Sequence, residues 1–259
     1  MSTNYNEPKK AYEAPKYEAP KKEYEYEEYQ PSQEYYEPPA KKDVYVDSYW
    51  TPTYEYIQDK YSEEKYPEKQ YVPEKTEEGY GTGKADYLIA NEYNNVLETY
   101  AKNDVIEAGY GSDKIDAGKG DDWLWGINKE HNADDKKYAQ DDYKEVDWMT
   151  GGKGKDIYAL GTEKYAHYAT NGEKDYAVIT DYTAGKDAVM LHGASENYVV
   201  GESSSLEKDG AMGDKAASIY WDQDKNGSYS KGDDMVAVFE GYSANEITAA
   251  KDSFVYVAA

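Results

Sequence analysis

A nine-residue period runs through the middle of the chain and constrains its fold more than any other feature. Residues 81–125 divide into five consecutive nonamers, and two further copies follow at 142–150 and 151–159. Each copy has a large hydrophobic residue at position eight and a carboxylate or amide at position six. Two nonamers can make one coil of a solenoid, and such coils bury their strands only by stacking on neighbours. The residues at position six are Asp86, Asn95, Asp104, Asp113, Asp122, Asp147 and Asp156.

The turn positions of the nonamers have the composition of a calcium-binding loop. Glycine at positions two and four allows backbone angles with positive φ, so that the chain turns tightly and directs carbonyl oxygens inward. The aspartate at position six adds an anionic oxygen, and Ca²⁺ prefers carbonyl and carboxylate oxygens as ligands. A metal-free glycine-rich solenoid, or a disordered linker, is the alternative interpretation. The turn glycines are Gly109, Gly111, Gly118, Gly120, Gly152 and Gly154.

The last nonamer, 151–159, matches the motif G-G-x-G-x-D-x-U-x in full, where U is a large hydrophobic residue. On this motif the chain resembles the RTX (hemolysin-type) calcium-binding proteins that bacteria export by type I secretion. The resemblance implies an all-β fold, in which a parallel β-roll of RTX nonapeptides continues into a β-rich C-terminal cap. Segment 175–193 is similar to the stretch that closes many such domains, and segments 218–240 and 252–257 to the family's C-terminal sheet and export signal.

In that family a calcium ion lies between the turns of repeats n and n+2. The resemblance therefore implies that Asp104 lies with Asp122 on one edge of the roll, and Asn95 with Asp113 on the other. The copies 90–98 and 99–107 lack both turn glycines, and the copy 81–89 has Lys84 at position four, so calcium binding by these three is left open. The expected calcium residues of the repeats are Asp86, Asp104, Gly109, Gly111, Asp113, Gly118, Gly120, Asp122, Asp147, Gly152, Gly154 and Asp156.

A second candidate calcium loop lies at residues 222–233, which follow the pattern D-x-D-x-N-G with a carboxylate at position twelve. The flanking segments have the composition of strands, so we expect a calcium-binding hairpin loop and not an EF-hand. A polar hairpin turn without an ion is the alternative. The side chains of Asp222, Asp224, Asn226 and Asp233 and the carbonyl of Ser228 are the expected ligands.

Composition divides the chain into three parts. Residues 1–78 are rich in Tyr, Pro, Glu and Lys and are predicted to be disordered, because they offer little apolar surface to bury; within them, 44–57 has a strand-like alternation. Residues 79–160 form the predicted β-roll, interrupted by an exposed insertion at 126–141. Residues 161–259 form the predicted cap. Its expected strands are 176–181, 188–191, 197–200, 216–221, 235–239 and 254–257, and its expected helix is 244–250.

Charge and cysteine content exclude several classes of partner. The formal net charge is −24 at pH 7, and no basic stripe is present, so we expect no nucleic acid. The chain has no cysteine, which excludes disulfides and thiolate metal sites. No apolar run is long enough for a transmembrane segment, and the N-terminus lacks the apolar core of a signal peptide. With the resemblance, these features predict a bacterial protein in the extracellular space or on the cell surface, exported without an N-terminal signal peptide.

No catalytic motif emerges. The three histidines, His131, His167 and His192, do not form H-E-x-x-H, and no G-x-S-x-G is present. We therefore expect a non-catalytic protein, with an unrecognised hydrolase as the weakest alternative.

Two hypotheses concern what the protein contacts besides calcium ions. The Tyr-rich tail favours a surface, matrix or adhesive role, through a cell-surface or matrix polysaccharide or through self-association of tails; a plain spacer is the alternative. The other hypothesis is a carbohydrate-binding module that uses Trp123, Trp125 and Trp148, which lie at nonamer positions that point away from the roll interior. We favour instead that these tryptophans pack beneath the insertion or a capping segment.

Overall fold

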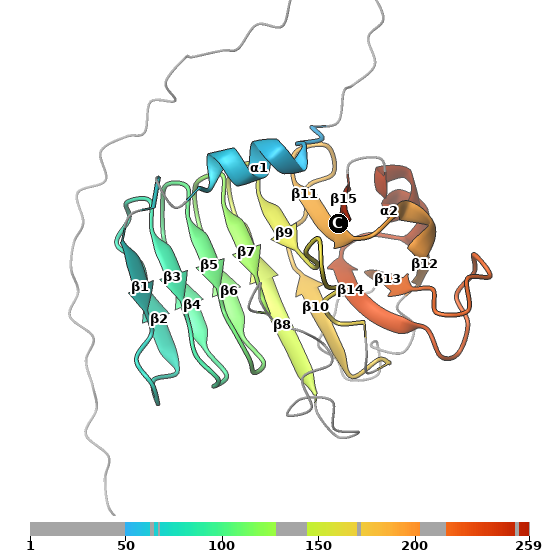
Figure 1. The fold of residues 1–259 in the computed structure, drawn as a ribbon, viewed down its shortest axis with the longest axis horizontal. Helices are drawn as coiled ribbons and strands as arrows, with labels where there is room; N and C mark the ends of the chain where they lie inside the picture. The colour runs from blue at the N-terminus through green and yellow to red at the C-terminus, as the bar shows by residue number, and fades with distance from the viewer. Residues whose placement is uncertain are drawn as a thin grey trace, which may run out of the picture. The chain divides into compact units, whose positions relative to one another are not determined.

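The repeats form two β-sheets that take successive strands of the chain in turn (Figure 1). In this computed structural model the described residues are 50–62, 65–66, 68–127, 144–169, 172–202, 216–251 and 254–258. One sheet has the strand order β1-β3-β5-β7-β9-β11-β15, and the other β12-β13-β14-β10-β8-β6-β4-β2. All neighbouring strands are parallel except β12–β13 and β13–β14. This alternation of odd and even strands is the β-roll that the nonamers predict.

The strands of the repeats are short because most residues of each nonamer form the turn. In the roll the strands are β1 (Lys69–Tyr71), β2 (Glu78–Tyr80), β3 (Tyr87–Ile89), β4 (Val96–Glu98), β5 (Val105–Glu107), β6 (Lys114–Asp116), β7 (Trp123–Trp125), β8 (Glu145–Thr150) and β9 (Ile157–Ala159). The cap adds β10 (Asp175–Ile179), β11 (Ala188–His192), η1 (Ser195–Asn197), β12 (Tyr198–Glu202), β13 (Ala216–Trp221), β14 (Asp234–Glu240), α2 (Ala244–Ala250) and β15 (Val255–Val257).

The register of the sheets confirms that one coil consists of two nonamers. Leu88 pairs with Ile106, and Ile106 pairs with Leu124, a step of two nonamers each time. In the other sheet Leu97 pairs with Ile115 in the same way. All five of these position-eight residues are buried in one core, which therefore extends along the inside of the roll.

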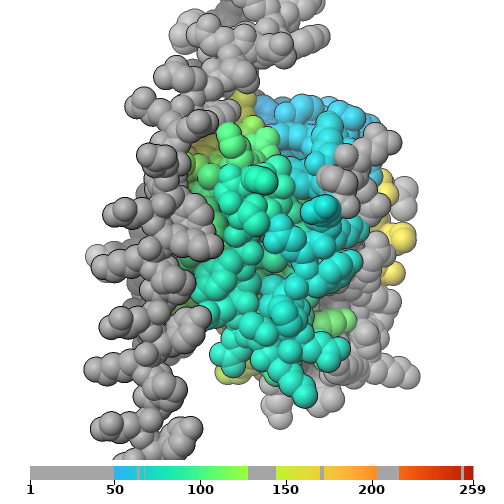
Figure 2. Space-filling model, turned by 90° about the vertical axis from the view of Figure 1, so that its left-hand side faces the viewer, coloured from blue at the N-terminus to red at the C-terminus, as the bar shows by residue number. Residues whose placement is uncertain are grey.

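The structure corrects the prediction for residues 50–78. These residues were expected to be disordered, but they contain α1 (Tyr54–Lys60), β1 and β2, so the roll begins before residue 79. The strand-like alternation at 44–57 was also misread where it is described, because 54–57 is helical. Ile57 and Tyr61 lie one turn apart on α1 and its C-cap, and both are buried against the outer face of the odd-numbered sheet. Figure 2 looks onto the end of the roll formed by the first strands and shows residues 50–62, in blue, at its upper right.

The cap agrees with its predicted elements. Each of the six expected strands is present within two residues of its predicted bounds, and α2 has the predicted range. Ser243 and Glu246 form a capping box that fixes the start of α2. The insertion predicted at 126–141 lies outside the described residues except for its first two, of which Ile127 is buried in the core. Within the described chain, neither helix has the length and apolar character needed to cross a bilayer.

Candidate metal centre

Five aspartates from successive turns form a hydrogen-bonded ladder along one edge of the roll. The backbone N–H of each donates to the Oδ1 of the next, at distances of 2.7, 2.7, 2.9 and 3.1 Å. The rungs of this Asp122 ladder are, in order, Asp86, Asp104, Asp122, Asp156 and Asp187. Asp104 and Asp122 thus lie together, as the pattern of repeats n and n+2 implies.

The opposite edge carries a shorter ladder of the same kind, the Asp113 ladder. The N–H of Asn95 donates to Oδ1 of Asp113 at 2.6 Å, and the N–H of Asp113 donates to Oδ1 of Asp147 at 2.9 Å. The two ladders place the position-six residues of all seven nonamers in two rows, one on each edge of the roll.

The inner rungs use only one carboxylate oxygen. Oδ2 of Asp104, Asp113, Asp122 and Asp156 is buried without a hydrogen-bond partner among the described residues. A buried anionic oxygen that lacks a partner is costly, and native structures rarely leave one so. Four such atoms in two rows, beside turns rich in backbone carbonyls, fit a hard cation that takes oxygen ligands, as Ca²⁺ does.

The outer rungs are satisfied by the protein itself. Asp86 accepts hydrogen bonds from Gln70 Nε2 and from the N–H of Thr82, both at 2.6 Å. Asp147 accepts one from the hydroxyl of Tyr168, and Asp187 accepts one from the N–H of Thr183 at 2.7 Å. The fit to calcium therefore rests on the four inner aspartates, and Asp86 and Asp147 close the ends of the rows.

Burial makes the ladders electrostatically unfavourable when their carboxylates are charged. It raises the pKa of Asp122 from 3.8 to about 9, with further contributions from Asp156 and Asp104. It raises the pKa of Asp104 to about 8 and that of Asp156 to about 7. The pKa of Asp113 is also raised, by burial and by the neighbouring Asp147. Such shifts are expected of anionic groups in a dry site that lacks its counter-charge.

The turn glycines allow the coils to stack closely. Gly120 and Gly154 have φ of +149° and +150°, and Gly118 and Gly152 have φ of +91° and +90°. A Cβ on Gly154 would lie 1.4 Å from the carbonyl oxygen of Gly120, and one on Gly120 would lie 1.8 Å from that of Lys102. The backbones at position four therefore touch along the Asp122 ladder, and only glycine fits at such approaches.

The structure bears on two of the repeats that lack glycine. In the copy 99–107, Tyr100 and Lys102 occupy positions two and four and adopt φ of +69° and +82°. This copy therefore makes a turn with positive φ at both positions, although non-glycine residues adopt it at a cost. In the copy 90–98, neither Asn91 nor Tyr93 has positive φ, so its turn differs from the others.

Two aspartates of the cap belong to the same edge and are absent from the predicted site. Asp187 is the last rung of the Asp122 ladder. Asp181 accepts hydrogen bonds from the N–H groups of Gly151 and Gly152, at 3.0 and 2.7 Å, and so closes the turn that carries Asp156. The signal that marks them is the spacing of Asp181, Gly185 and Asp187, which continues the repeat chemistry after the nine-residue period has ended.

The loop at 222–233 brings its carboxylates together. It joins β13 and β14, as expected of a hairpin, and Asp222, Asp224 and Asp233 place ligand atoms within 4.8 Å of one another. The carboxylate of Asp222 accepts from the N–H groups of Asn226 and Gly227, at 3.2 and 2.8 Å. The amide nitrogen of Asn226 donates to Asp224 at 2.7 Å, and the N–H of Ser228 donates to Asn226 Oδ1 at 2.8 Å. The loop is thus held by its own polar groups.

The tryptophans of the repeats do not form an exposed platform. Trp125 is buried, and Trp123 is half-buried between the rings of Trp125 and Tyr61, at centroid distances of 5.2 and 5.3 Å. The packing interpretation is therefore correct for these two, but the covering element is the segment around α1. The predicted insertion lies almost entirely outside the described residues, and no observation on the described residues favours a sugar-binding face at Trp123 and Trp125.

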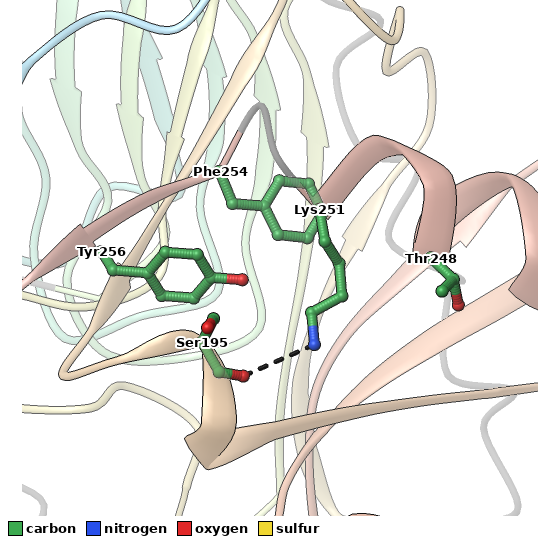
Figure 3. Close-up of a pocket in the computed structure, with 5 residues that line it drawn as sticks. All are labelled: Ser195, Thr248, Lys251, Phe254 and Tyr256. Atoms are coloured by element: carbon green, nitrogen blue, oxygen red, sulfur yellow. Dashed lines mark hydrogen bonds between the residues drawn. The ribbon is translucent and has the colours of Figure 1, made fainter.

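A pocket of about 470 Å³ lies in the cap, apart from both ladders (Figure 3). It is lined by Ser195, Thr248, Lys251, Phe254 and Tyr256. The ammonium of Lys251 donates to the carbonyls of Ser195 and Tyr198, at 3.4 and 3.0 Å, and burial lowers its pKa. No carboxylate is among these lining residues.

The comparison with known families agrees with the geometry. A family model of the RTX calcium-binding nonapeptide repeat, in four copies, matches residues 80–109 and 99–126. No curated protein matches the chain. The matched stretch contains Asp86, Asp104, Asp113 and Asp122, which are rungs of the two ladders. RTX nonapeptide repeats bind calcium ions, and residues 80–126 of this chain match the model of that repeat.

Proposed function

We propose that this is a secreted, non-catalytic calcium-binding protein whose β-roll folds when it binds calcium outside the cell. The observation that carries the proposal is the set of four buried, unpartnered Oδ2 atoms on Asp104, Asp113, Asp122 and Asp156. RTX-type repeats are typical of extracellular proteins, and extracellular calcium is abundant enough for sites of modest affinity.

The charge of the chain couples calcium to folding. A formal net charge of −24 opposes a compact state through self-repulsion, and the ladders concentrate part of that charge in a dry interior. Calcium removes the repulsion where carboxylates are densest, so that binding free energy becomes folding free energy. Inside the cell, where free calcium is scarce, the same chain stays unfolded and exportable.

Circular dichroism of the full chain tests this proposal. In EGTA we expect the far-UV spectrum of a largely unfolded chain, and in millimolar calcium that of a β-rich protein. Magnesium at the same concentration should not reproduce the change, because Mg²⁺ is smaller and demands a stricter octahedral shell. A spectrum that does not respond to calcium would contradict the proposal, whether the chain is folded or unfolded.

The Tyr-rich tail is the part we assign to a surface, matrix or adhesive role. The repeated Tyr, Lys and Pro residues of 1–49 lie outside the described residues, so the assignment rests on composition. We expect a variant that lacks 1–49 to keep the calcium-induced spectral change and to lose retention at the cell surface or matrix, measured by fractionation of cells that express it. Unchanged retention would instead make the tail a spacer.

A further inference from the structure

The segment from Trp50 to Gln70 runs along the whole edge that carries the Asp122 ladder. In Figure 1, α1 lies across the ends of the odd-numbered strands at this edge. The N–H of Trp50 donates to the carbonyl of Gly185 at 3.0 Å, and the Trp50 ring lies 5.4 Å from the ammonium of Lys155. At its other end, Gln70 reaches Asp86. Described residues between Trp50 and Gln70 therefore touch the turns of all five rungs or their immediate neighbours.

The central contacts fall on the residues that directly precede two rungs. The hydroxyl of Tyr61 donates to the carbonyl of Asp121, and the hydroxyl of Tyr66 donates to the carbonyl of Asn103, both at 2.6 Å. Lys60 forms an ion pair with Asp121 Oδ2 at 2.8 Å. These carbonyls belong to the peptide groups that position Asp122 and Asp104. Docking of the segment therefore depends on the backbone orientation of the calcium turns.

Asp121 connects the segment to a third turn. While its Oδ2 holds Lys60, its Oδ1 accepts the N–H of Lys155 at 2.8 Å, and its own N–H donates to Asn103 Oδ1 at 2.9 Å. The position-five residues of three successive turns are thus linked in an outer row parallel to the ladder. A change in any of these turns moves a partner of the segment.

The same segment covers apolar surface of the odd-numbered sheet. Ile57, Tyr61 and Tyr66 are at most 5% exposed and belong to one cluster with Tyr87 and Trp125. The helix α1 has only seven residues, and a helix this short is not stable by itself in water. Its structure therefore depends on the sheet beneath it and on the turns beside it.

We propose that Trp50, α1, Tyr61 and Tyr66 form a calcium-dependent clasp, which docks on the roll only when the turns of Asp104, Asp122 and Asp156 are ordered by calcium. Docking holds Trp50, the first described residue, beside the turn of Gly185. Because linkage is reciprocal, the docked clasp in turn lowers the calcium concentration that the roll needs to fold. The inference rests on the proposed calcium-dependent folding.

Hydrogen exchange of the full chain, in EGTA and in a calcium titration, tests the clasp. The amides of Ile57 and Tyr61, which donate within α1, should be protected in calcium and exchange freely in EGTA. The double variant Tyr61→Phe with Tyr66→Phe keeps both rings and removes both hydroxyls. The loss of two hydrogen bonds to partly buried carbonyls weakens docking about tenfold or more. The lost docking free energy is divided among the several calcium ions that bind. We therefore expect the calcium concentration at the midpoint of folding to rise about two- to fivefold.

The matched control is Tyr56→Phe, a tyrosine on the same helix that is 47% exposed, which should leave the midpoint unchanged. The clasp is refuted if α1 amides are equally protected with and without calcium while roll amides such as Trp123 respond, or if the double variant titrates like the control. If no roll amide responds to calcium, the proposed function fails first and the clasp fails with it. The two failures are therefore distinguishable in one data set.

Discussion

Replacing Gly154 with alanine is expected to prevent the roll from folding in saturating calcium. The residue has φ of +150°, where an L-amino acid is strained, and its Cβ would lie 1.4 Å from the carbonyl oxygen of Gly120. Relief would require the turns of two stacked coils to separate, which disrupts the hydrogen bond from Asp122 to Asp156 as well. We expect a loss of more than about 4 kcal/mol of folding free energy, so that the variant in saturating calcium lacks the β-rich far-UV circular dichroism spectrum that the unchanged chain gives.

The variant Gly83→Ala is the matched control for this substitution. Gly83 also has positive φ, at +74°, but an added Cβ meets no atom within 4 Å. Its cost should be limited to the conformational strain, about 1–2 kcal/mol, so that calcium still folds the chain. Similar losses for the two variants would show that close stacking of the position-four backbones does not hold the roll together.

The sequence predicts the roll well because its period is a property of the chain alone. Leu88, Ile106 and Leu124 recur at a fixed step, and any solenoid that buries all three must place them in one register. The aspartates at position six follow the same step, so their alignment in rows is a consequence of the register. The strands and the helix of the cap are predicted for a simpler reason, since short hydrophobic runs alternate there with Gly, Asp and Asn.

The described residues between 50 and 78 could not be predicted in this way, because their structure depends on tertiary contacts. Tyr54, Ile57 and Tyr61 make a helical apolar stripe that is too short to stand out among the tyrosines and prolines around it. The helix is stable only over Trp125 and Val105, which are distant in sequence. Composition describes what a segment can bury by itself, and here the burial partner is the outer face of the roll.

Asp187 was missed as a rung because the chain leaves its period before the ladder ends. The step from Asp104 to Asp122 is 18 residues, but that from Asp122 to Asp156 is 34 and that from Asp156 to Asp187 is 31. The same hydrogen bond from a backbone N–H to Oδ1 joins the rungs at every step, although the connections differ in length. A count of nonamers therefore finds where the ladder begins and underestimates its length.

The metal-free chain should be more stable at pH 5 than at pH 8, opposite to the usual behaviour of a protein with paired carboxylates. Burial raises the folded-state pKa of Asp122 to about 9 and of Asp104 to about 8, from 3.8 in the unfolded chain. Between about pH 4 and pH 9 the folded state therefore binds more protons, and its stability falls as the pH rises through that window. One pKa unit corresponds to about 1.4 kcal/mol, so several such groups together favour pH 5 by more than about 5 kcal/mol.

Far-UV circular dichroism of the calcium-free chain across this pH range measures the effect as a gain of β-structure when the pH falls from 8 to 5, and two variants locate it. Asp122→Asn removes one buried charge, so it should flatten the pH dependence in EGTA and stabilise the metal-free roll at pH 8, as Asn95 already does at the end of the Asp113 ladder. The same variant should need more calcium to fold, because it loses an anionic ligand. Glu74→Gln, which removes a charge from an exposed loop, should change neither. A metal-free chain that is equally stable at pH 5 and pH 8 would mean that the ladders are hydrated in solution. Protons and calcium ions compete for the same buried oxygens. The unpartnered Oδ2 atoms would then no longer be evidence for calcium.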